Sequence, residues 1–203
     1  PKTQTSLTSN YIYNLFQDRD YNLWIATDGG GLNLYNRHTN SFTHFLHHDN
    51  DPSSLKDNSV RCIYQDRQNN LWIGTYNGLD RMIGNTGKFE HYTIDPSNKE
   101  SSNQEVNSIL EDSQNNIWVA TSQGLALLNP STKNFVLYKH DDKNKKSISN
   151  SYITCLLEDE NKNVWVGTKN GLNLLNKDKN SFIRFLNDEK NLNSLANNYI
   201  WAL

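Results

Sequence analysis

Long apolar runs, net charge and cysteine are all scarce in this chain. Across 203 residues, 20 Lys and Arg face 22 Asp and Glu, which leaves a net charge of −2. A charge this balanced argues against a polyanion or an anionic membrane as the main partner, so we expect no nucleic acid. No apolar run approaches the 18 or so residues that a membrane helix needs. We therefore expect no membrane contact by this segment.

What the chain does have is a six-residue pattern that returns four times. Its centre is a tryptophan, and the four tryptophans are 48, 46 and 47 residues apart. A period of this length is typical of solenoids and propellers. The four copies of the pattern are Asn22–Thr27, Asn70–Thr75, Asn116–Thr121 and Asn163–Thr168, and their tryptophans are Trp24, Trp72, Trp118 and Trp165.

Each copy reads as four short strands. A stretch with apolar residues on both faces comes first, which predicts a strand buried on both sides. These stretches are Tyr11–Gln17, Ser59–Gln65, Glu105–Glu111 and Ser151–Glu158. The tryptophan pattern is the second strand. A third strand follows, and a fourth carries two aromatic residues three positions apart, such as Phe42 and Phe45.

Two kinds of turn separate these strands. An Asp-x-x-x-Asn turn joins the first two strands, and we expect its Asp to bond backbone amides and its Asn to take the left-handed conformation. The turn between the second and third strands contains a glycine, which supplies the positive φ of a tight connection. The turn pairs are Asp18/Asn22, Asp66/Asn70, Asp112/Asn116 and Asp159/Asn163, and the glycines are Gly31, Gly78, Gly124 and Gly171.

This order predicts an all-β fold, a segment of a β-propeller with four consecutive four-stranded antiparallel blades. The blades span about residues 10–46, 58–93, 104–139 and 151–186, within one partial propeller over 1–203. Residues 198–203 repeat the start of the first blade, which predicts the first strand of a fifth. We expect the tryptophans to be structural and to pack between blades, and the chain to be part of a larger array.

The two cysteines, Cys62 and Cys155, fall in one column of the repeat, two copies apart. Asn14 and Ser108 occupy that column elsewhere, so it favours a small side chain. A disulfide needs β-carbons within roughly 3.5 to 4.5 Å, and equivalent positions in non-adjacent repeats rarely come so close. We expect both thiols to be free.

The repeat resembles a known family. The combination of Ile109 to Asp112, Asn116 to Thr121 and Gly124-Leu125 is similar to the two-component regulator propeller repeat, and all four copies share it. The resemblance implies the extracytoplasmic, periplasmic sensor region of a hybrid histidine kinase, anchored in the membrane by other segments. It also implies further blades, signalling domains outside this chain and a homodimer of the full-length protein. Any kinase activity would lie in those domains, so we expect this segment not to be an enzyme.

Several motifs suggest metal or phosphate sites, and a structural interpretation is better for each. Asp18-x-Asp20-x-Asn22 and Asp159-x-Asn161-x-Asn163 resemble the opening of a calcium loop but lack its Gly and its distal Glu. His44-x-x-His47-His48 has no accompanying Cys or carboxylate cluster. Gly29-Gly30-Gly31 opens no helix, so it lacks the context of a phosphate loop. We predict no metal and no cofactor.

The residues that differ from blade to blade are the candidate binding site. The start of each first strand and the turn between the second and third strands share one face, where propellers commonly form a central mouth. Aromatic, amide and charged side chains there suit a small polar ligand such as an oligosaccharide. These mouth residues are Tyr11, Asp28, Arg61, Tyr76, Asn77, Glu105, Gln123, Tyr152, Lys169, Asn170 and Tyr199.

Three functions therefore stay open. The preferred one is a sensor segment that binds a polar ligand and relays the signal to a kinase domain outside this chain. The second is a structural or protein-interaction propeller. The third is a polysaccharide-cleaving or lyase-type propeller enzyme. The sequence shows no acid/base pair confined to one blade, which is weak evidence against this function.

Overall fold

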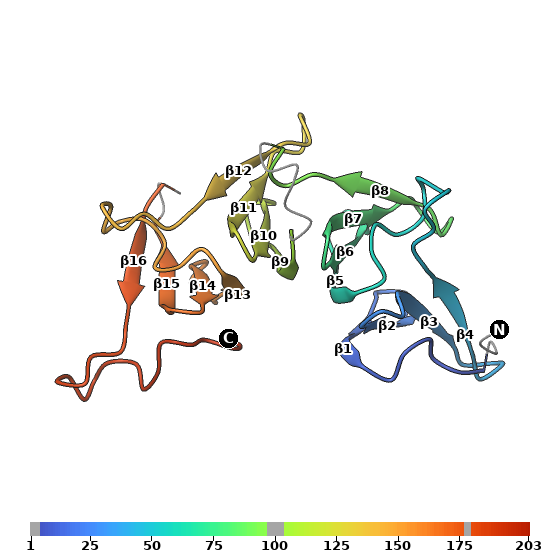
Figure 1. The fold of residues 1–203 in the computed structure, drawn as a ribbon, viewed down its shortest axis with the longest axis horizontal. Coiled ribbons are helices and arrows are strands. Elements are labelled where there is room, and N and C mark those ends of the chain that lie inside the picture. The colour runs from blue at the N-terminus through green and yellow to red at the C-terminus, as the bar shows by residue number, and fades with distance from the viewer. Residues whose placement is uncertain (1–4, 97–103, 177–179) are drawn as a thin grey trace. The chain divides into compact units, whose positions relative to one another are not determined.

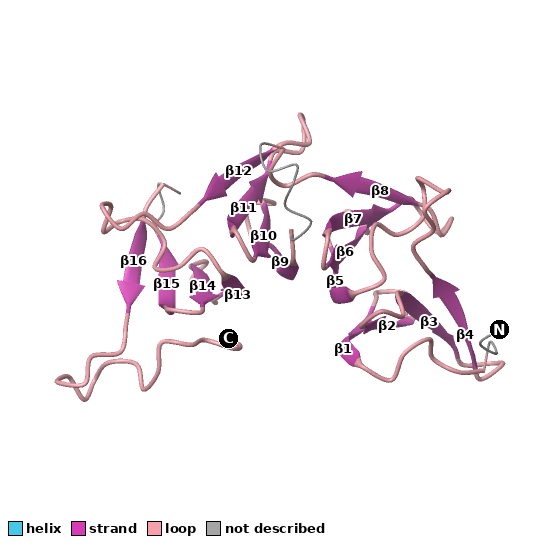
Figure 2. Cartoon of the chain, viewed as in Figure 1, coloured by secondary structure: helices cyan, strands magenta, loops and turns pink. Residues whose placement is uncertain are grey.

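The computed structural model describes residues 5–96, 104–176 and 180–203 (Figures 1 and 2). Within these ranges every regular element is a strand. None of the described residues forms a helix of the length and apolarity that crossing a membrane requires. The chain forms two compact units, unit 1 (residues 1–106) and unit 2 (residues 107–203).

Unit 1 holds two antiparallel sheets of four strands, each sheet following the order of the chain. Blade 1 consists of β1 (Ile12–Gln17), β2 (Leu23–Thr27), β3 (Leu32–Asn36) and β4 (Ser41–Phe45). Blade 2 consists of β5 (Val60–Gln65), β6 (Leu71–Thr75), β7 (Gly78–Met82) and β8 (Phe89–Tyr92). The first strands of the two blades, β1 and β5, are neighbours.

Unit 2 repeats this arrangement. Blade 3 consists of β9 (Val106–Glu111), which begins at the last residue of unit 1, β10 (Ile117–Thr121), β11 (Gly124–Leu128) and β12 (Phe135–Tyr138). Blade 4 consists of β13 (Ile153–Glu158), β14 (Val164–Thr168), β15 (Gly171–Leu175) and β16 (Phe182–Phe185). The predicted fold class, four consecutive four-stranded antiparallel blades, is confirmed.

The Asp-x-x-x-Asn turn is built on its aspartate, which joins the turn to the tryptophan strand. In blade 3, one oxygen of Asp112 accepts the backbone N–H groups of Gln114 and Asn116 at 2.9 Å. The other accepts the indole N–H of Trp118, also at 2.9 Å. The same indole bond recurs from Trp24, Trp72 and Trp165 to Asp18, Asp66 and Asp159. Because this bond forms in every blade, the aspartate and the tryptophan are always six residues apart.

The left-handed residue of this turn is not the asparagine. The residue before it has positive φ in every blade, and these residues are Tyr21, Asn69, Asn115 and Lys162, with φ between 63° and 66°. Our expectation that Asn takes this conformation is wrong. The asparagine is needed for its side chain, because Asn22 Nδ2 donates to Asp18 Oδ2 at 2.9 Å.

A threonine closes the second turn. The hydroxyl of Thr121 donates to the carbonyl of Gly124 at 2.7 Å, and Thr121 is almost fully buried. Thr27, Thr75 and Thr168 make the equivalent bond. The predicted positive φ is confirmed at all four turn glycines. At Gly124 (φ 153°) a β-carbon would also lie 2.6 Å from the carbonyl oxygen of Tyr138, so no other residue fits.

Aromatic side chains bridge the two blades of each unit. In unit 1, Trp24 packs on Phe45 with ring centroids 5.8 Å apart, and Phe45 meets Phe89 of blade 2 edge-on at 6.1 Å. In unit 2, Trp118, Tyr138 and Phe182 form the same series. The aromatic pair of the fourth strand thus has two roles: its second member receives the tryptophan of its own blade, and its first member meets the preceding blade.

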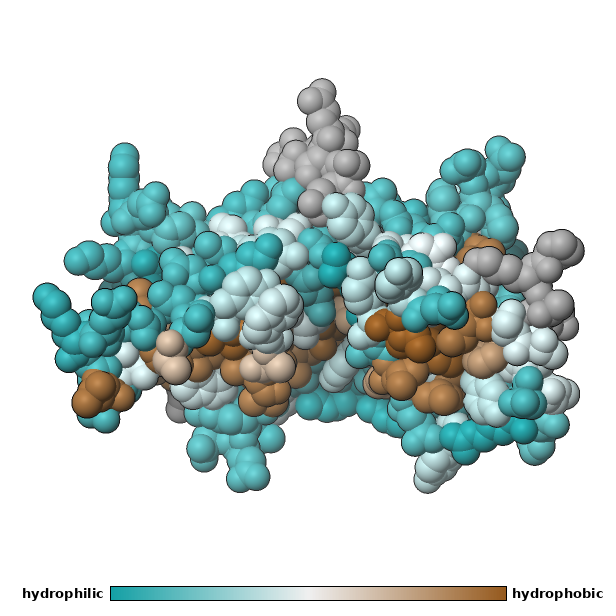
Figure 3. Space-filling model, turned by 60° about the horizontal axis from the view of Figure 1, so that its bottom comes forward, coloured by the Kyte–Doolittle hydropathy of each residue, from teal (hydrophilic) through white to brown (hydrophobic). Residues whose placement is uncertain are grey.

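Among the four repeat tryptophans, Trp165 is the exception: it is only part-buried, whereas Trp24, Trp72 and Trp118 are buried. At the opposite end of the chain, β1 leaves Ile12 and Leu15 47% and 61% exposed. Figure 3 shows this apolar surface in brown on unit 1. Blades 1 and 4 therefore each present a face of the kind that other blades bury.

Residues 198–203 form no strand, in contrast to the prediction. The segment nonetheless lies against blade 4 as the first strand of a next blade would. The Gly171 N–H donates to Asn198 O at 2.6 Å, as the Gly31 N–H does to Asn58 O at 2.7 Å. Ile200 N donates to Thr168 O at 3.1 Å.

In the repeat column of Cys62 and Cys155, the size of each side chain is matched to that of the residue opposite it on the neighbouring strand. Cys62 pairs with Gly74 and Cys155 with Gly167, whereas Asn14 pairs with Ala26. A β-carbon on Gly74 would lie 2.4 Å from Cys62 Sγ. Sulfur is larger than oxygen or nitrogen, so its partner must be glycine. Both thiols are free, as expected, and burial raises the pKa of Cys62 to about 12, which leaves it unreactive.

We expect Gly74→Ala to lower the free energy of unfolding by about 1–3 kcal/mol through overpacking. Adding Cys62→Ser removes the larger sulfur and should recover part of that loss. The rest should remain, because a β-carbon on Gly74 would also lie 2.6 Å from Val106 Cγ1. Urea unfolding of the wild type, both single variants and the double variant measures the coupling. Additive effects of the two substitutions would contradict the size-matching.

The turn carboxylates also link stability to pH. Asp159 accepts hydrogen bonds from the indole N–H of Trp165 and from the side-chain and backbone N–H groups of Asn163. These bonds lower the pKa of Asp159 to about 2. Burial acts to raise the pKa of Asp112, but the bonds from Trp118 and Asn116 outweigh it, so that pKa is lowered too. Each lowered pKa contributes stability that is present above pH 4 and lost as pH falls toward 2.

Asp159→Asn tests this linkage. Both oxygens of Asp159 accept hydrogen bonds, and asparagine keeps only one acceptor, so either the indole N–H or the turn N–H groups lose their partner. The variant should therefore be less stable than the wild type at pH 7. The difference should shrink as pH falls from about 4 to about 2, because the wild-type carboxyl becomes protonated there. Urea unfolding at pH 7, 4 and 2.5 measures it, and a constant difference would rule out the carboxylate as its source.

Candidate ligand-binding site

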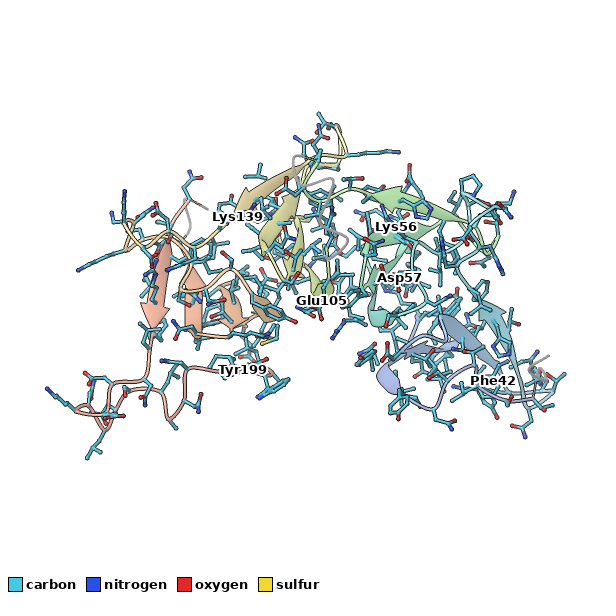
Figure 4. All side chains as sticks on the ribbon, in the orientation of Figure 1. Phe42, Lys56, Asp57, Glu105, Lys139 and Tyr199 are labelled. Carbon is cyan, nitrogen blue, oxygen red and sulfur yellow. The ribbon has the colours of Figure 1, made fainter. Side chains whose placement is uncertain are left out.

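Unit 1 gathers its charged mouth residues around Arg61. The guanidinium of Arg61, on β5, forms an ion pair with the carboxylate of Glu105. It also lies over two tyrosine rings, 4.9 Å from the centroid of Tyr13 and 5.8 Å from that of Tyr76. The side chain of Glu105 is only 5% exposed and that of Arg61 26%. Glu105 precedes β9, as Figure 4 shows.

Asp28 extends this cluster from the turn after β2. Its carboxylate accepts the hydroxyl of Ser59, and its backbone N–H donates to Tyr11 O at 2.9 Å. Burial raises the pKa of Tyr13 and a hydrogen bond to Asp28 raises it further, while Arg61 acts in the opposite direction. We call Tyr13, Asp28, Arg61, Tyr76 and Glu105 the Arg61 cluster.

Tyr13 was missed by the sequence analysis, although a signal for it exists. Tyr13 and Arg61 occupy one column of the repeat, in which the later copies carry Asn107 and Thr154. That column varies as much as the columns chosen for the mouth. Tyr11 contributes less than its position predicts, because the residue is 78% exposed and only its backbone carbonyl contacts the cluster.

In unit 2 the mouth residues form two aromatic contacts. The ammonium of Lys169 lies 3.5 Å from the centroid of the Tyr152 ring. Tyr199, labelled in Figure 4 on the C-terminal segment, stacks on Trp201 at 4.5 Å with an interplanar angle of 27°. Trp201 is 78% exposed. The Tyr199–Trp201 pair thus offers an exposed aromatic surface, while one face of Tyr152 already carries a cation.

The three amide-bearing mouth residues have a shared backbone role. Asn77, Gln123 and Asn170 each donate their backbone N–H to the hydroxyl of the threonine two residues earlier, at 3.0 to 3.2 Å. That bond is part of the turn and is the same in blades 2, 3 and 4. Their side chains are half-buried or exposed at the turn.

His44 and His47 of the candidate metal motif have partners within the protein. Among the described residues, no three His, Cys, Asp or Glu side chains come together as a metal site would require. His44 bonds Asn33, while His47 bonds Leu55 O and Asp49, so these two histidines serve different segments. In the Arg61 cluster each carboxylate is already paired. The cluster can therefore donate hydrogen bonds to a ligand, accept hydrogen bonds from it and contact it through the tyrosine rings.

A repeated four-stranded blade, closed by an Asp–Trp bond and carrying variable polar residues at one end, defines this chain as part of a β-propeller protein. The family described as Two component regulator propeller matches residues 6–29, 54–77, 100–123 and 147–170. These matches contain all four tryptophan patterns in full, together with the turn aspartates. The chain belongs to the two-component regulator propeller family. No curated protein matches it.

Solved structures agree with this assignment. The extracellular domain of BT4673 from B. thetaiotaomicron is described in one structure as part of a hybrid two-component system and in another as part of a one-component system. The chain is 30% identical to both, with TM-scores of 0.76 and 0.77 over 96% and 100% of its residues. It spans only 24% and 25% of those chains.

A more distant structure shares the fold alone. Virginiamycin B lyase from Staphylococcus aureus is 15% identical, with a TM-score of 0.64 over 88% of this chain and 56% of its own. At this identity the similarity concerns the blade architecture and carries no information on catalysis.

The burial of Glu105 makes Arg61 structurally necessary. We expect Arg61→Ala to lower the free energy of unfolding by about 3–5 kcal/mol, because it leaves a buried carboxylate without its cation. Glu105→Gln added to it should restore much of the loss. Thermal unfolding of the two variants side by side measures the effect, and an Arg61→Ala protein as stable as the wild type would show that Glu105 is solvated.

Proposed function

We propose that this chain is a ligand-sensing part of an extracellular regulator propeller, and that it binds an oligosaccharide or a similar small polar ligand at the Arg61 cluster. The observation that carries the proposal is the meeting of Tyr13, Arg61 and Tyr76 with two carboxylates at the variable end of the blades. Aromatic edges beside paired donors and acceptors suit a polyhydroxylated ligand.

The family and the neighbouring structures support the sensor role. Those neighbours are extracellular domains of regulatory systems, and the present chain corresponds to about a quarter of their length. We propose that further blades cover the apolar face of β1, where Ile12 and Leu15 are exposed. Membrane anchoring, a periplasmic location, dimerisation and relay to a kinase domain belong to the whole protein and are proposed on the same basis. This segment itself is proposed to be non-catalytic.

The charges of the cluster favour a neutral ligand. Glu105 neutralises Arg61, and Asp28 adds a further carboxylate, so the cluster carries a net charge of −1. A carboxylate-bearing sugar would approach Asp28 without gaining a free cation, which is unfavourable in a partly buried site. Neutral sugars avoid this repulsion.

Two tyrosine substitutions test the site without disturbing the buried ion pair. Tyr13→Ala and Tyr76→Ala should each weaken binding of a neutral oligosaccharide by about 1–3 kcal/mol, the scale of a lost aromatic or hydrogen-bond contact. Tyr21→Ala is the matched control, since Tyr21 is 74% exposed in the β1–β2 turn. Calorimetric titration of the full-length protein with neutral and uronic-acid oligosaccharides measures the affinities.

Equal affinity in all three variants would place the ligand elsewhere. Binding of no oligosaccharide by the wild type would favour a structural or protein-interaction propeller. Cleavage of any oligosaccharide, followed by product analysis in the same samples, would favour the enzyme alternative.

A further inference from the structure

Blades 1 and 2 are joined by a crossover, residues 48–57, that two histidines hold. His47 follows β4 and has an acceptor at each ring nitrogen. Its Nδ1 lies 2.6 Å from Leu55 O and its Nε2 lies 3.0 Å from Asp49 Oδ1. A neutral imidazole has only one N–H donor. Both contacts are hydrogen bonds only when His47 carries two ring protons and is therefore a cation.

His91, on β8, has the same property. Its Nδ1 lies 2.7 Å from Asp80 Oδ1, and its Nε2 lies 2.9 Å from Pro52 O. Asp80 is fully buried on β7, directly opposite His91 in the strand register. The imidazolium of His91 thus pairs with a buried carboxylate on one side and holds the crossover on the other.

Both histidines act on one short part of the crossover, residues 52–56. His91 bonds Pro52 O and His47 bonds Leu55 O, while Asp80 accepts the Lys56 N–H at 2.9 Å. Figure 4 labels Lys56 beside β7. The Phe89 N–H completes the attachment by donating to Ser53 O at 2.8 Å. Leu55 itself is fully buried in the core between the blades.

The charged groups around each ring favour its protonated form. The bond to Leu55 O raises the pKa of His47; burial opposes this, and the carboxylates of Asp49 and Asp57 add to it. The bond to Asp80 raises the pKa of His91; burial and Lys56 oppose it, and the charge of Asp80 and the bond to Pro52 O support it.

In unit 2, His140 repeats the contacts of His47, while Asn187 and Arg184 replace histidine at two equivalent positions. His140 Nδ1 lies 2.8 Å from Ile148 O and its Nε2 lies 2.9 Å from Asp142 Oδ1, as at His47. After β16, Asn187 takes this position and donates its neutral amide to Leu195 O. In the column of His91, Arg184 donates Nε to Ser147 O at 2.7 Å with a permanent charge.

We propose that His47 and His91 form a pH-sensitive latch on the crossover between blades 1 and 2, closed when both rings are protonated. Loss of either ring proton leaves a nitrogen lone pair facing an acceptor oxygen, so that hydrogen bond must open. Because both pKa values are raised on folding, the stability they add is fully present below pH 6.5 and is lost as pH rises through the folded values. The latch thus loosens on the alkaline side.

Nitrogen-15 NMR of the histidine rings in the wild-type chain tests the protonation state directly. At pH 6 both nitrogens of His47 and of His91 should carry protons, and both rings should titrate above 6.5. Hydrogen exchange of the Lys56 and Phe89 amides reports the latch. After correction for the intrinsic tenfold increase per pH unit, their protection should fall several-fold between pH 6 and pH 8.5.

The matched variants copy the residues of blade 4. His47→Asn keeps an amide bond to Leu55 O, and His91→Arg keeps a permanent cation, so protection in the double variant should change little over this pH range. A single-proton tautomer at pH 6 for either histidine, or a midpoint at or below 6.5, would overturn the latch. So would a pH-independent protection in the wild type.

Discussion

The hydrogen bond from each tryptophan indole to a turn aspartate is the interaction on which the rest of the structure depends. It lets a large apolar side chain be buried between blades without leaving its N–H unsatisfied. The same carboxylate organises the β1–β2 type of turn through the backbone N–H groups and the asparagine side chain. Turn geometry and inter-blade packing are therefore set by one residue, which explains why the pattern recurs with so little variation.

Much of the fold could be predicted because the repeat presents each element four times. The alternation of apolar residues, the turn glycines and the spacing of the aromatic pairs are each weak signals alone and become strong because they recur four times. The order of the strands within a blade follows from the short turns that join them. The tertiary role of single atoms could not be predicted in this way. The threonine hydroxyl that closes each second turn looked like an ordinary strand residue, and the left-handed residue before Asn22 or Asn70 has no fixed identity.

The candidate site was only partly predictable, because variation marks positions and not contacts. The sequence placed Arg61, Glu105, Asp28 and Tyr76 at one end of the blades, and the structure brings them together in unit 1. It could not show that Glu105 is buried against Arg61, so that the cation is already neutralised. Nor could it show that the guanidinium lies over the Tyr76 ring while that residue stays 40% exposed.

The size-matching of Cys62 with Gly74 and of Asn14 with Ala26 limits how such a repeat array can evolve. The paired residues lie on neighbouring strands of one hairpin, so neither can be exchanged between blades alone. A recombination that joined a cysteine-bearing first strand to an alanine-bearing second strand would create a clash at the centre of the blade. An exchange that preserves packing must transfer the whole hairpin. The smallest unit that can be recombined between blades is therefore two strands.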